Sequence, residues 1–71
     1  MNNVQKALQI NPNLKIVKWY LDQDFAGLKK GDVYKIVDHK TCRQTCDNFQ
    51  TAEKAWSYVV DHSVASTLAK D

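Results

Sequence analysis

Proline and glycine are scarce in this sequence of 71 residues, which holds one proline and two glycines. Flexible linkers and disordered tails are usually rich in these residues, so neither is predicted. Pro12, Gly27 and Gly31 each stand between stretches that read as regular structure, where a break in the chain is needed. A chain of this length without a linker is expected to form a single domain, residues 1–71.

Long apolar runs are lacking as well. No segment reaches the roughly 18 consecutive apolar residues of a membrane span, and the opening residues, MNNVQKAL, do not have the basic and then apolar pattern of a secretory signal. We therefore expect a cytoplasmic protein that has no membrane partner. In that reducing compartment the two cysteines are expected to remain free thiols.

A strong excess of one charge is also missing, because ten lysines and arginines face eight aspartates and glutamates, a formal net charge of +2. Dedicated nucleic-acid-binding domains usually carry a larger basic excess. The positive charge is nevertheless uneven along the chain, and its densest part is either a nucleic-acid-contacting edge or an ordinary solvated hairpin. These basic residues are Lys29, Lys30, Lys35, Lys40 and Arg43.

The first predicted element is a short helix over residues 3–10. Asn3 can cap its start, and the apolar residues within it share one face. The helix should end before Pro12, because the residue preceding a proline disfavours the helical conformation. A helix this short is not stable in isolation, so it needs a surface to pack on.

Three strands are predicted next, over residues 14–22, 33–39 and 43–49. The first, LKIVKWYLD, is rich in β-branched and aromatic residues. Alternation places apolar side chains on both of its faces, which predicts a central strand or a second face covered by a helix or a partner. The chain is expected to reverse between the last two strands, around Lys40 and Thr41.

An amphipathic helix is the clearest element and is predicted over residues 52–68. Thr51 can cap it, and Glu53 places a negative charge at the positive end of the helix dipole. Apolar residues recur at the i, i+3, i+4 and i+7 spacing of one helical face. Trp56 lies at the centre of this stripe, so we expect its truncation to cost more stability than any other.

The predicted order is α-β-β-β-α, an α+β domain in which a three-stranded antiparallel meander packs against the C-terminal helix. This order resembles the topology of double-stranded-RNA-binding domains, and several small phage-encoded inhibitors share the same general build. The resemblance covers the order of elements alone, which carries no function. Double-stranded-RNA-binding domains also place a lysine cluster at the start of the last helix, where this chain has TAEKAW, with one lysine and one glutamate.

The stretch DHKTCRQTC brings together residue types that are used in chemistry. Zinc accepts histidine and cysteine side chains as ligands, and the chain offers His39, Cys42, Cys46 and the later His62. If residues 43–49 form a strand, however, the two cysteines lie about 13 Å apart, too far to share one ion or a disulfide. We therefore predict neither a metal site nor a cofactor, and we interpret the stretch as the turn of a hairpin.

Catalytic machinery is not recognisable. The residue types needed for a cysteine nucleophile and its base are present, but no known motif surrounds them. A chain this short buries only about 60% of the surface that its unfolded form exposes, which leaves little spare stability for a strained catalytic site. We predict no enzymatic activity.

Protein binding is the favoured function, because the chain has more large apolar residues than one small core can bury, and Tyr and Trp are common anchors of interfaces. An open sheet edge would also allow pairing with a partner strand or with a second copy as a homodimer. We predict a small regulatory protein, such as an inhibitor of bacterial or phage origin. The protein-contact candidates are Trp19, Tyr20, Phe25, Leu28 and Tyr58.

The alternative function is nucleic-acid binding by the basic hairpin, residues 28–43. Aromatic side chains on a sheet that is flanked by basic residues can stack with bases, and Tyr34 lies among the lysines of this hairpin. The same aromatic residues are also explained as parts of the core. Binding to phosphates would fall steeply with salt, which separates the two functions.

Overall fold

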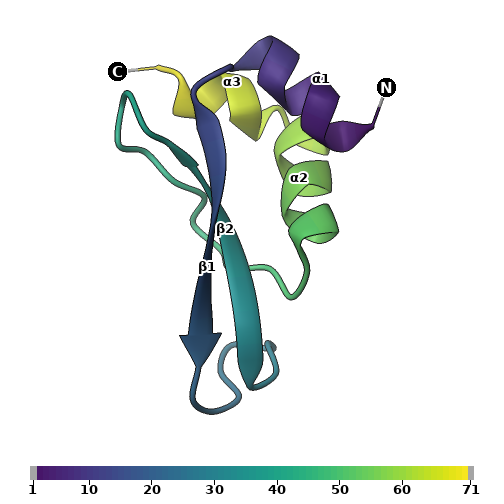
Figure 1. Cartoon of the computed structure of the whole chain (residues 1–71), viewed down its shortest axis with the longest axis vertical. Helices are drawn as coiled ribbons and strands as arrows, with labels where there is room; N and C mark the ends of the chain where they lie inside the picture. The colour runs from purple at the N-terminus through teal and green to yellow at the C-terminus, as the bar shows by residue number, and fades with distance from the viewer. Residues whose placement is uncertain (1, 71) are drawn as a thin grey trace.

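The structure, a computed structural model, describes residues 2–70. It contains the helices α1 (Asn3–Ile10), α2 (Ala52–Asp61) and α3 (Val64–Leu68), and the antiparallel strands β1 (Leu14–Leu21) and β2 (Gly31–Asp38). The helices gather beside one end of the hairpin, and its other end extends beyond them (Figure 1). The α+β class is therefore confirmed. No helix within residues 2–70 combines the length and the apolar character needed to cross a membrane.

α1 begins with a capping box. The side chain of Asn2 accepts a hydrogen bond from the backbone N–H of Gln5 at 2.8 Å, and the Gln5 side chain accepts one from the N–H of Asn2 at 3.2 Å. The cap is therefore Asn2, one residue earlier than the sequence indicates. The backbone becomes extended at Asn11, directly before Pro12.

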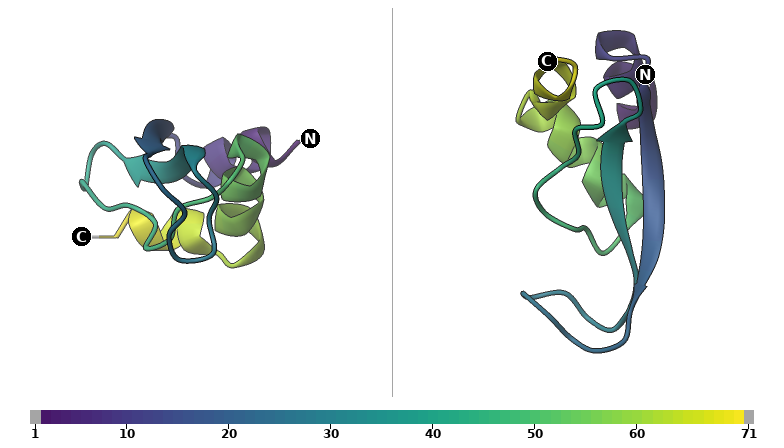
Figure 2. Two further views of the ribbon diagram at one scale, coloured as in Figure 1. Left: turned by 90° about the horizontal axis from the view of Figure 1, so that it is seen from below. Right: turned by 90° about the vertical axis from the view of Figure 1, so that its left-hand side faces the viewer.

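The two strands pair from Leu14 opposite Asp38 to Leu21 opposite Gly31. Side chains directly opposite each other lie on the same face of an antiparallel pair. The even-numbered side chains face the helices, because Leu14 and Ile36 belong to the core. The odd-numbered side chains form an outer face, and the three helices all lie on the other side of the sheet (Figure 2).

The loop between the strands folds back on itself. Phe25 and Leu28 exchange two backbone hydrogen bonds of 3.0 and 2.9 Å. Ala26 and Gly27 between them both have positive φ angles, 53° and 83°. Such a two-residue turn requires the left-handed region at both positions, which glycine adopts at little cost and alanine does not. The loop bends toward the side of the sheet that carries the helices (Figure 2).

The expected third strand at residues 43–49 is not formed, and the described part of the chain has a two-stranded sheet. This segment makes only isolated bridges to β2, Val37 with Gln44 and Tyr34 with Phe49. From Gln44 to Phe49 the segment advances by five residues, whereas β2 advances by only three between the partners of these two residues. Two residues of the segment therefore bulge out, and a continuous ladder cannot form. The three-stranded meander was therefore a wrong prediction.

The buried side chain of Thr45 replaces part of the missing ladder. Its hydroxyl accepts a hydrogen bond from the N–H of Ile36 at 3.4 Å and donates one to the carbonyl of Asp47 at 3.1 Å. The Thr45 N–H in turn donates to the carbonyl of Ile36 at 3.0 Å. One threonine thus satisfies backbone groups that a regular third strand would have paired.

The C-terminal helix is divided in two. α2 ends at Asp61, and Ser63 adopts the left-handed conformation with φ of 57°, which breaks the helix before α3 begins. The single helix expected over residues 52–68 is therefore wrong in its continuity. The apolar stripe still continues through the break, because Ala65 and Leu68 of α3 are both buried.

The core lies between β2 and the helices. α2 packs on β2, and α1 and α3 pack on α2. β1 contributes one buried residue, Leu14 at its start, so most of this strand lies outside the core. The buried residues of the core are Ala7, Leu14, Ile36, Ala55, Trp56, Val59, Ala65 and Leu68.

Candidate functional site

Three large aromatic side chains are exposed at the end of the hairpin that extends beyond the helices. Trp19 is 47% exposed, Tyr20 59% and Phe25 67%. We refer to these three residues as the aromatic tip. Aromatic side chains are usually buried or half-buried because exposing them to water is unfavourable. Their exposure marks this end of the hairpin as a candidate contact surface, on which Trp19 and Tyr20 lie on opposite faces of the sheet.

Trp19 lies on the outer face of the sheet, directly opposite Val33. Val33 is fully buried although no helix covers this face, as expected if the indole shields it. The indole Nε1–H donates a hydrogen bond of 3.1 Å to the side-chain oxygen of Asn48, and the Lys35 ammonium lies 5.7 Å from the ring centroid. These contacts hold the ring in one orientation and leave almost half of its surface to the solvent.

Tyr20 and Phe25 border a shallow hollow of about 480 Å³, which Leu21, Asp22 and Gln23 complete. A second hollow, of about 600 Å³, lies between residues 25–28 and 46–49. Phe25 lines both of them, so a partner that fills either hollow contacts this ring. Aromatic side chains are enriched in protein interfaces.

The loop that carries Phe25 is held by hydrogen bonds. The carboxylate of Asp24 accepts one from the N–H of Lys30 at 2.7 Å. The side chain of Gln50 accepts one from the N–H of Lys29 at 2.9 Å and donates one to the Lys29 carbonyl at 3.3 Å. Because these bonds fix the loop before any partner arrives, binding would lose less conformational entropy than it would for a free loop.

β1 is the free edge of the sheet. On β2, Tyr34 exchanges hydrogen bonds of 2.8 Å with Phe49, so its backbone groups point away from β1. Along an antiparallel pair, the backbone N–H and C=O groups of successive residues point alternately toward the paired strand and away from it. The outward-pointing N–H and C=O groups of β1 therefore belong to Ile16, Lys18 and Tyr20, and within residues 2–70 these groups have no hydrogen-bond partner. Figure 2 shows β1 as the outermost strand.

The structure separates the five protein-contact candidates. Trp19, Tyr20 and Phe25 form the aromatic tip, and Leu28 is half-buried in the turn with Phe25. Tyr58 lies elsewhere, on α2. It packs against the core, with its ring centroid 5.1 Å from that of Phe49 and 4.7 Å from that of His62. Tyr58 is therefore not part of the tip.

The basic residues do not form one patch. Lys29 and Lys30 lie in the loop at the aromatic tip, whereas Lys40 and Arg43 follow the opposite end of β2. An eight-residue strand separates the two pairs by roughly 25 Å. Aspartates also offset the charge near the tip: the ammonium of Lys18, for example, lies 4.0 Å from the carboxylate of Asp32.

The histidines and cysteines form no metal site in the part of the chain that the structure describes, where no group of three or more His, Cys, Asp and Glu side chains comes together. Cys42 and Cys46 are both exposed free thiols. Cys42 lies in the turn after β2 with φ of 63°, a conformation that costs a non-glycine residue energy. The stretch DHKTCRQTC is thus a turn followed by the bulged segment.

Sequence reasoning missed a buried polar group at the other end of β2. Asp38 is fully buried, and its carboxylate accepts hydrogen bonds from the Asn11 amide at 2.7 Å and from the N–H groups of Lys40 and Thr41 at 2.7 and 3.0 Å. The Asn11 amide, followed by the Thr41 N–H, holds the pKa of Asp38 below its ordinary value. An aspartate at the start of a turn is the sequence signal that was available.

The Asp38 network is structural. Asn11 also donates to the carbonyl of Ala65 at 3.1 Å, and the hydroxyl of Thr41 donates to the carbonyl of Leu68 at 2.7 Å. Both acceptors belong to α3, so the network fastens this helix to the end of the hairpin.

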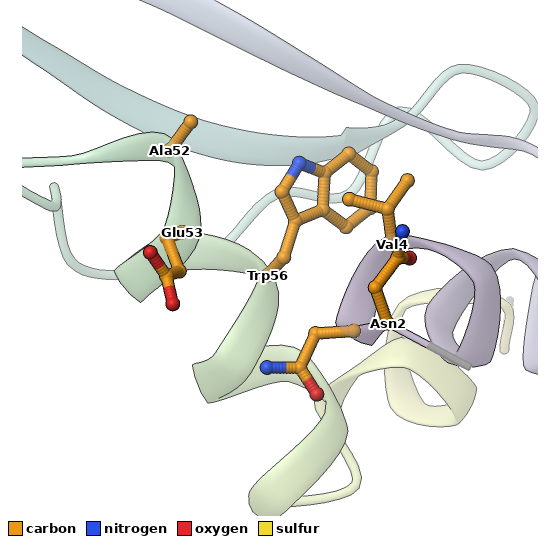
Figure 3. A pocket seen from close by; sticks show the side chains of 6 residues that line it. Asn2, Val4, Ala52, Glu53 and Trp56 are labelled. Carbon is orange, nitrogen blue, oxygen red and sulfur yellow. The ribbon is translucent and has the colours of Figure 1, made fainter.

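A cleft of about 560 Å³ opens between the first turns of α1 and α2. Figure 3 shows the Trp56 indole in its wall, between Ala52 and Val4, with Glu53 at the rim. Trp56 is only 8% exposed, so the ring belongs to the core more than to the cleft. Glu53 is the one ionisable side chain among the lining residues, and a lone carboxylate does not make a catalytic arrangement.

Comparison with known proteins assigns no family to the chain. No protein-family model, no curated protein and no solved structure matches it. The resemblance in element order to double-stranded-RNA-binding domains is also lost, because the described sheet has two strands and the last helix is divided. Inference about function therefore rests on the surface of the molecule.

Proposed function

We propose that this chain is a non-enzymatic binding module that docks a protein partner through the aromatic tip. The observation that carries the proposal is the exposure of Trp19, Tyr20 and Phe25 in the last residues of β1 and the loop that follows it. Trp and Tyr are over-represented among the residues that dominate binding energy in protein interfaces. Burying three such rings against a partner would remove a large apolar surface from water.

The position of the tip supports a regulatory role. The end of the hairpin that carries the tip extends beyond the helices (Figure 1), so a partner can contact it without disturbing the core. A small regulator or inhibitor, of bacterial or phage origin, fits a domain that presents three exposed aromatic side chains on a preorganised hairpin end. The cytoplasm is the compartment we propose, because two exposed free thiols suit reducing conditions.

A capture experiment tests this function. The wild-type chain, the tip variant Phe25→Ser and the control Ile10→Ser are immobilised and exposed to native lysate, with and without nuclease. Ile10 is a matched control because it is an apolar residue 49% exposed on α1, away from the tip. We expect the wild type and Ile10→Ser to retain the same nuclease-resistant protein and Phe25→Ser to lose it. Equal retention by Phe25→Ser would contradict the proposal.

Nucleic-acid binding ranks second, because the basic residues are spread along the whole of β2: Lys29 and Lys30 precede it, Lys35 lies within it, and Lys40 and Arg43 follow it. We predict only non-specific binding, with a Kd no tighter than about 10⁻⁶ M at physiological salt. Reversing the charge of Lys29 and Lys30 should slow association with the protein partner without abolishing it, since charges at the rim of an interface mainly affect the on-rate. Sub-micromolar binding to a defined RNA or DNA, lost on that reversal, would invert the ranking.

A further inference from the structure

We propose that the free edge of β1 binds an extended, acidic segment of the partner protein as an additional β-strand. This inference rests on the proposed function and specifies how the partner docks beside the aromatic tip. The observation behind it is the row of backbone groups on Ile16, Lys18 and Tyr20, which point away from β2 and have no hydrogen-bond partner within residues 2–70.

The spacing of these groups determines what can satisfy them. Alternate residues of a strand lie about 7 Å apart and each presents one donor and one acceptor in the same direction. Another extended backbone has this repeat, and helices do not. β1 is eight residues long and contains no proline, and no bulge interrupts its pairing with β2. Such an edge is a template for the addition of another strand. Proteins usually block an exposed edge with a proline, a bulge or a covering segment.

The charge of β1 indicates the chemistry of the added strand. Lys15 and Lys18 are exposed on opposite faces of the strand, and β1 contains no acidic residue. Lys18 is already near Asp32, but at 4.0 Å and with both side chains more than half exposed this pair is weak. An acidic residue directly opposite Lys18 would form a favourable cross-strand pair.

The same charge disfavours a second copy of this chain as the occupant. The antiparallel register that satisfies all three outward-pointing residues places Lys18 of one copy directly opposite Lys18 of the other. Like charges in directly opposite positions destabilise a strand pair. β1 presents aromatic and β-branched side chains on both faces of the sheet. Apolar residues of the added strand, on either side of its acidic residue, would pack against them.

A designed peptide tests the proposal. The probe is acetyl-Thr-Val-Thr-Glu-Thr-Val-Glu-amide, which in antiparallel register places glutamates opposite Lys18 and Lys15. A matched peptide has lysine in place of both glutamates, and another carries an N-methyl group on the central glutamate. We expect the first peptide to perturb the amide resonances of Ile16, Lys18 and Tyr20 most, and both control peptides to bind several-fold more weakly.

Two variants separate charge from backbone. Lys18→Ala removes the charge and keeps the N–H, and we expect a loss of about two- to fivefold in affinity for the acidic peptide. Lys18→Pro also removes the outward-pointing N–H but breaks no bond to β2, so proline is tolerated there. We expect it to weaken binding by about tenfold or more. Circular dichroism checks that both variants are folded.

Hydrogen exchange gives a readout that needs no variant. The amides of Ile16, Lys18 and Tyr20 should exchange quickly in the free protein and become protected when the acidic peptide is bound. Absence of both binding and protection at millimolar peptide would overturn the proposal, as would a concentration-dependent dimer that Lys18→Pro abolishes. If the lysate partner is lost on Phe25→Ser but kept by Lys18→Pro, docking at the aromatic tip stands and strand addition fails.

Discussion

The two ends of the β-hairpin are built from the same strands and have opposite environments. At one end Leu14, Ile36 and Asp38 are buried, and at the other Trp19 and Tyr20 are exposed. The difference follows from lengths. A ten-residue helix such as α2 spans about 15 Å, whereas an eight-residue strand spans about 26 Å. The strands therefore extend beyond the helices that cover them, and the large aromatic side chains Trp19 and Tyr20 beyond that limit stay on the surface.

The two tryptophans give the most direct test of this difference, and the largest effect is expected at Trp56. Its ring lies in the core and is 8% exposed, so Trp56→Ala should cost about 3–5 kcal/mol of unfolding free energy. That is a large part of the stability of a small domain. Urea denaturation followed by circular dichroism measures the loss. A midpoint close to that of the wild type would show that α2 does not pack as described.

A smaller loss of stability is expected from Asp38→Asn at the buried end of the hairpin. The carboxylate accepts hydrogen bonds from three N–H groups, and an asparagine amide would turn a donor toward some of them. The Asn11 amide holds the pKa of Asp38 below the ordinary value of 3.8, so the ionised form is favoured in the folded state.

The pH dependence follows from that direction. The stabilisation from Asp38 is present above pH 3.8 and is lost as the pH falls from there through the lowered pKa of the folded protein. The melting temperature of the wild type should therefore fall more steeply below pH 3.8 than that of Asp38→Asn. Parallel curves for the two proteins would show that Asp38 does not carry this acid sensitivity.

Trp19→Ala is expected to cost less, about 1–2 kcal/mol, because the ring is 47% exposed and is held by one hydrogen bond to Asn48 and by the nearby Lys35 ammonium. The same substitution should weaken partner binding more than any change in the core that leaves the protein folded. Comparing its stability with that of Trp56→Ala under identical conditions tests the contrast between the two ends. Equal losses would mean that the tip belongs to the core.

The smallest effect is expected from replacing both cysteines by serine. Cys42 and Cys46 are exposed, and substitutions at such positions usually change stability by no more than about 0.5 kcal/mol. We also predict that the purified protein carries no stoichiometric zinc. Elemental analysis and a melting curve with a chelator measure this. About one zinc per chain, together with unfolding on chelation, would contradict both predictions.

The sequence predicted where most helices and strands lie better than it predicted where they are interrupted. The first helix occupies the residues expected, because Pro12 determines where it must stop. The third strand was expected from its composition, but composition does not reveal the bulge that Thr45 stabilises through its side chain. The break at Ser63 was missed for a related reason, since an apolar stripe can continue through a change of direction.

The candidate surface was only partly predictable. Trp19 and Trp56 are the same type of residue, so the sequence does not reveal that one is exposed and the other buried. That difference depends on how far along the strands the helices extend. The two apolar faces of the first strand led us to expect a central strand, or a second face covered by a helix or a partner. β1 is instead an edge strand of the described sheet, and no helix covers its outer face (Figure 2). Lys29 and Lys40 belong to the same basic stretch of the sequence but lie at opposite ends of β2, since residues of an extended hairpin can be far apart in space.

The hydrogen bond between Asn11 and Ala65 has a consequence for the order of folding. It joins residues 54 positions apart in the sequence, and the hydrogen bond from Thr41 to Leu68 joins residues 27 positions apart. Closing such long loops costs conformational entropy, and these bonds can offset that cost only after the end of the hairpin has formed. The five-residue α3 has little stability of its own, so it should dock last in folding and detach first in the native state. A protease acting on the native protein would therefore find its first cleavage site in this helix.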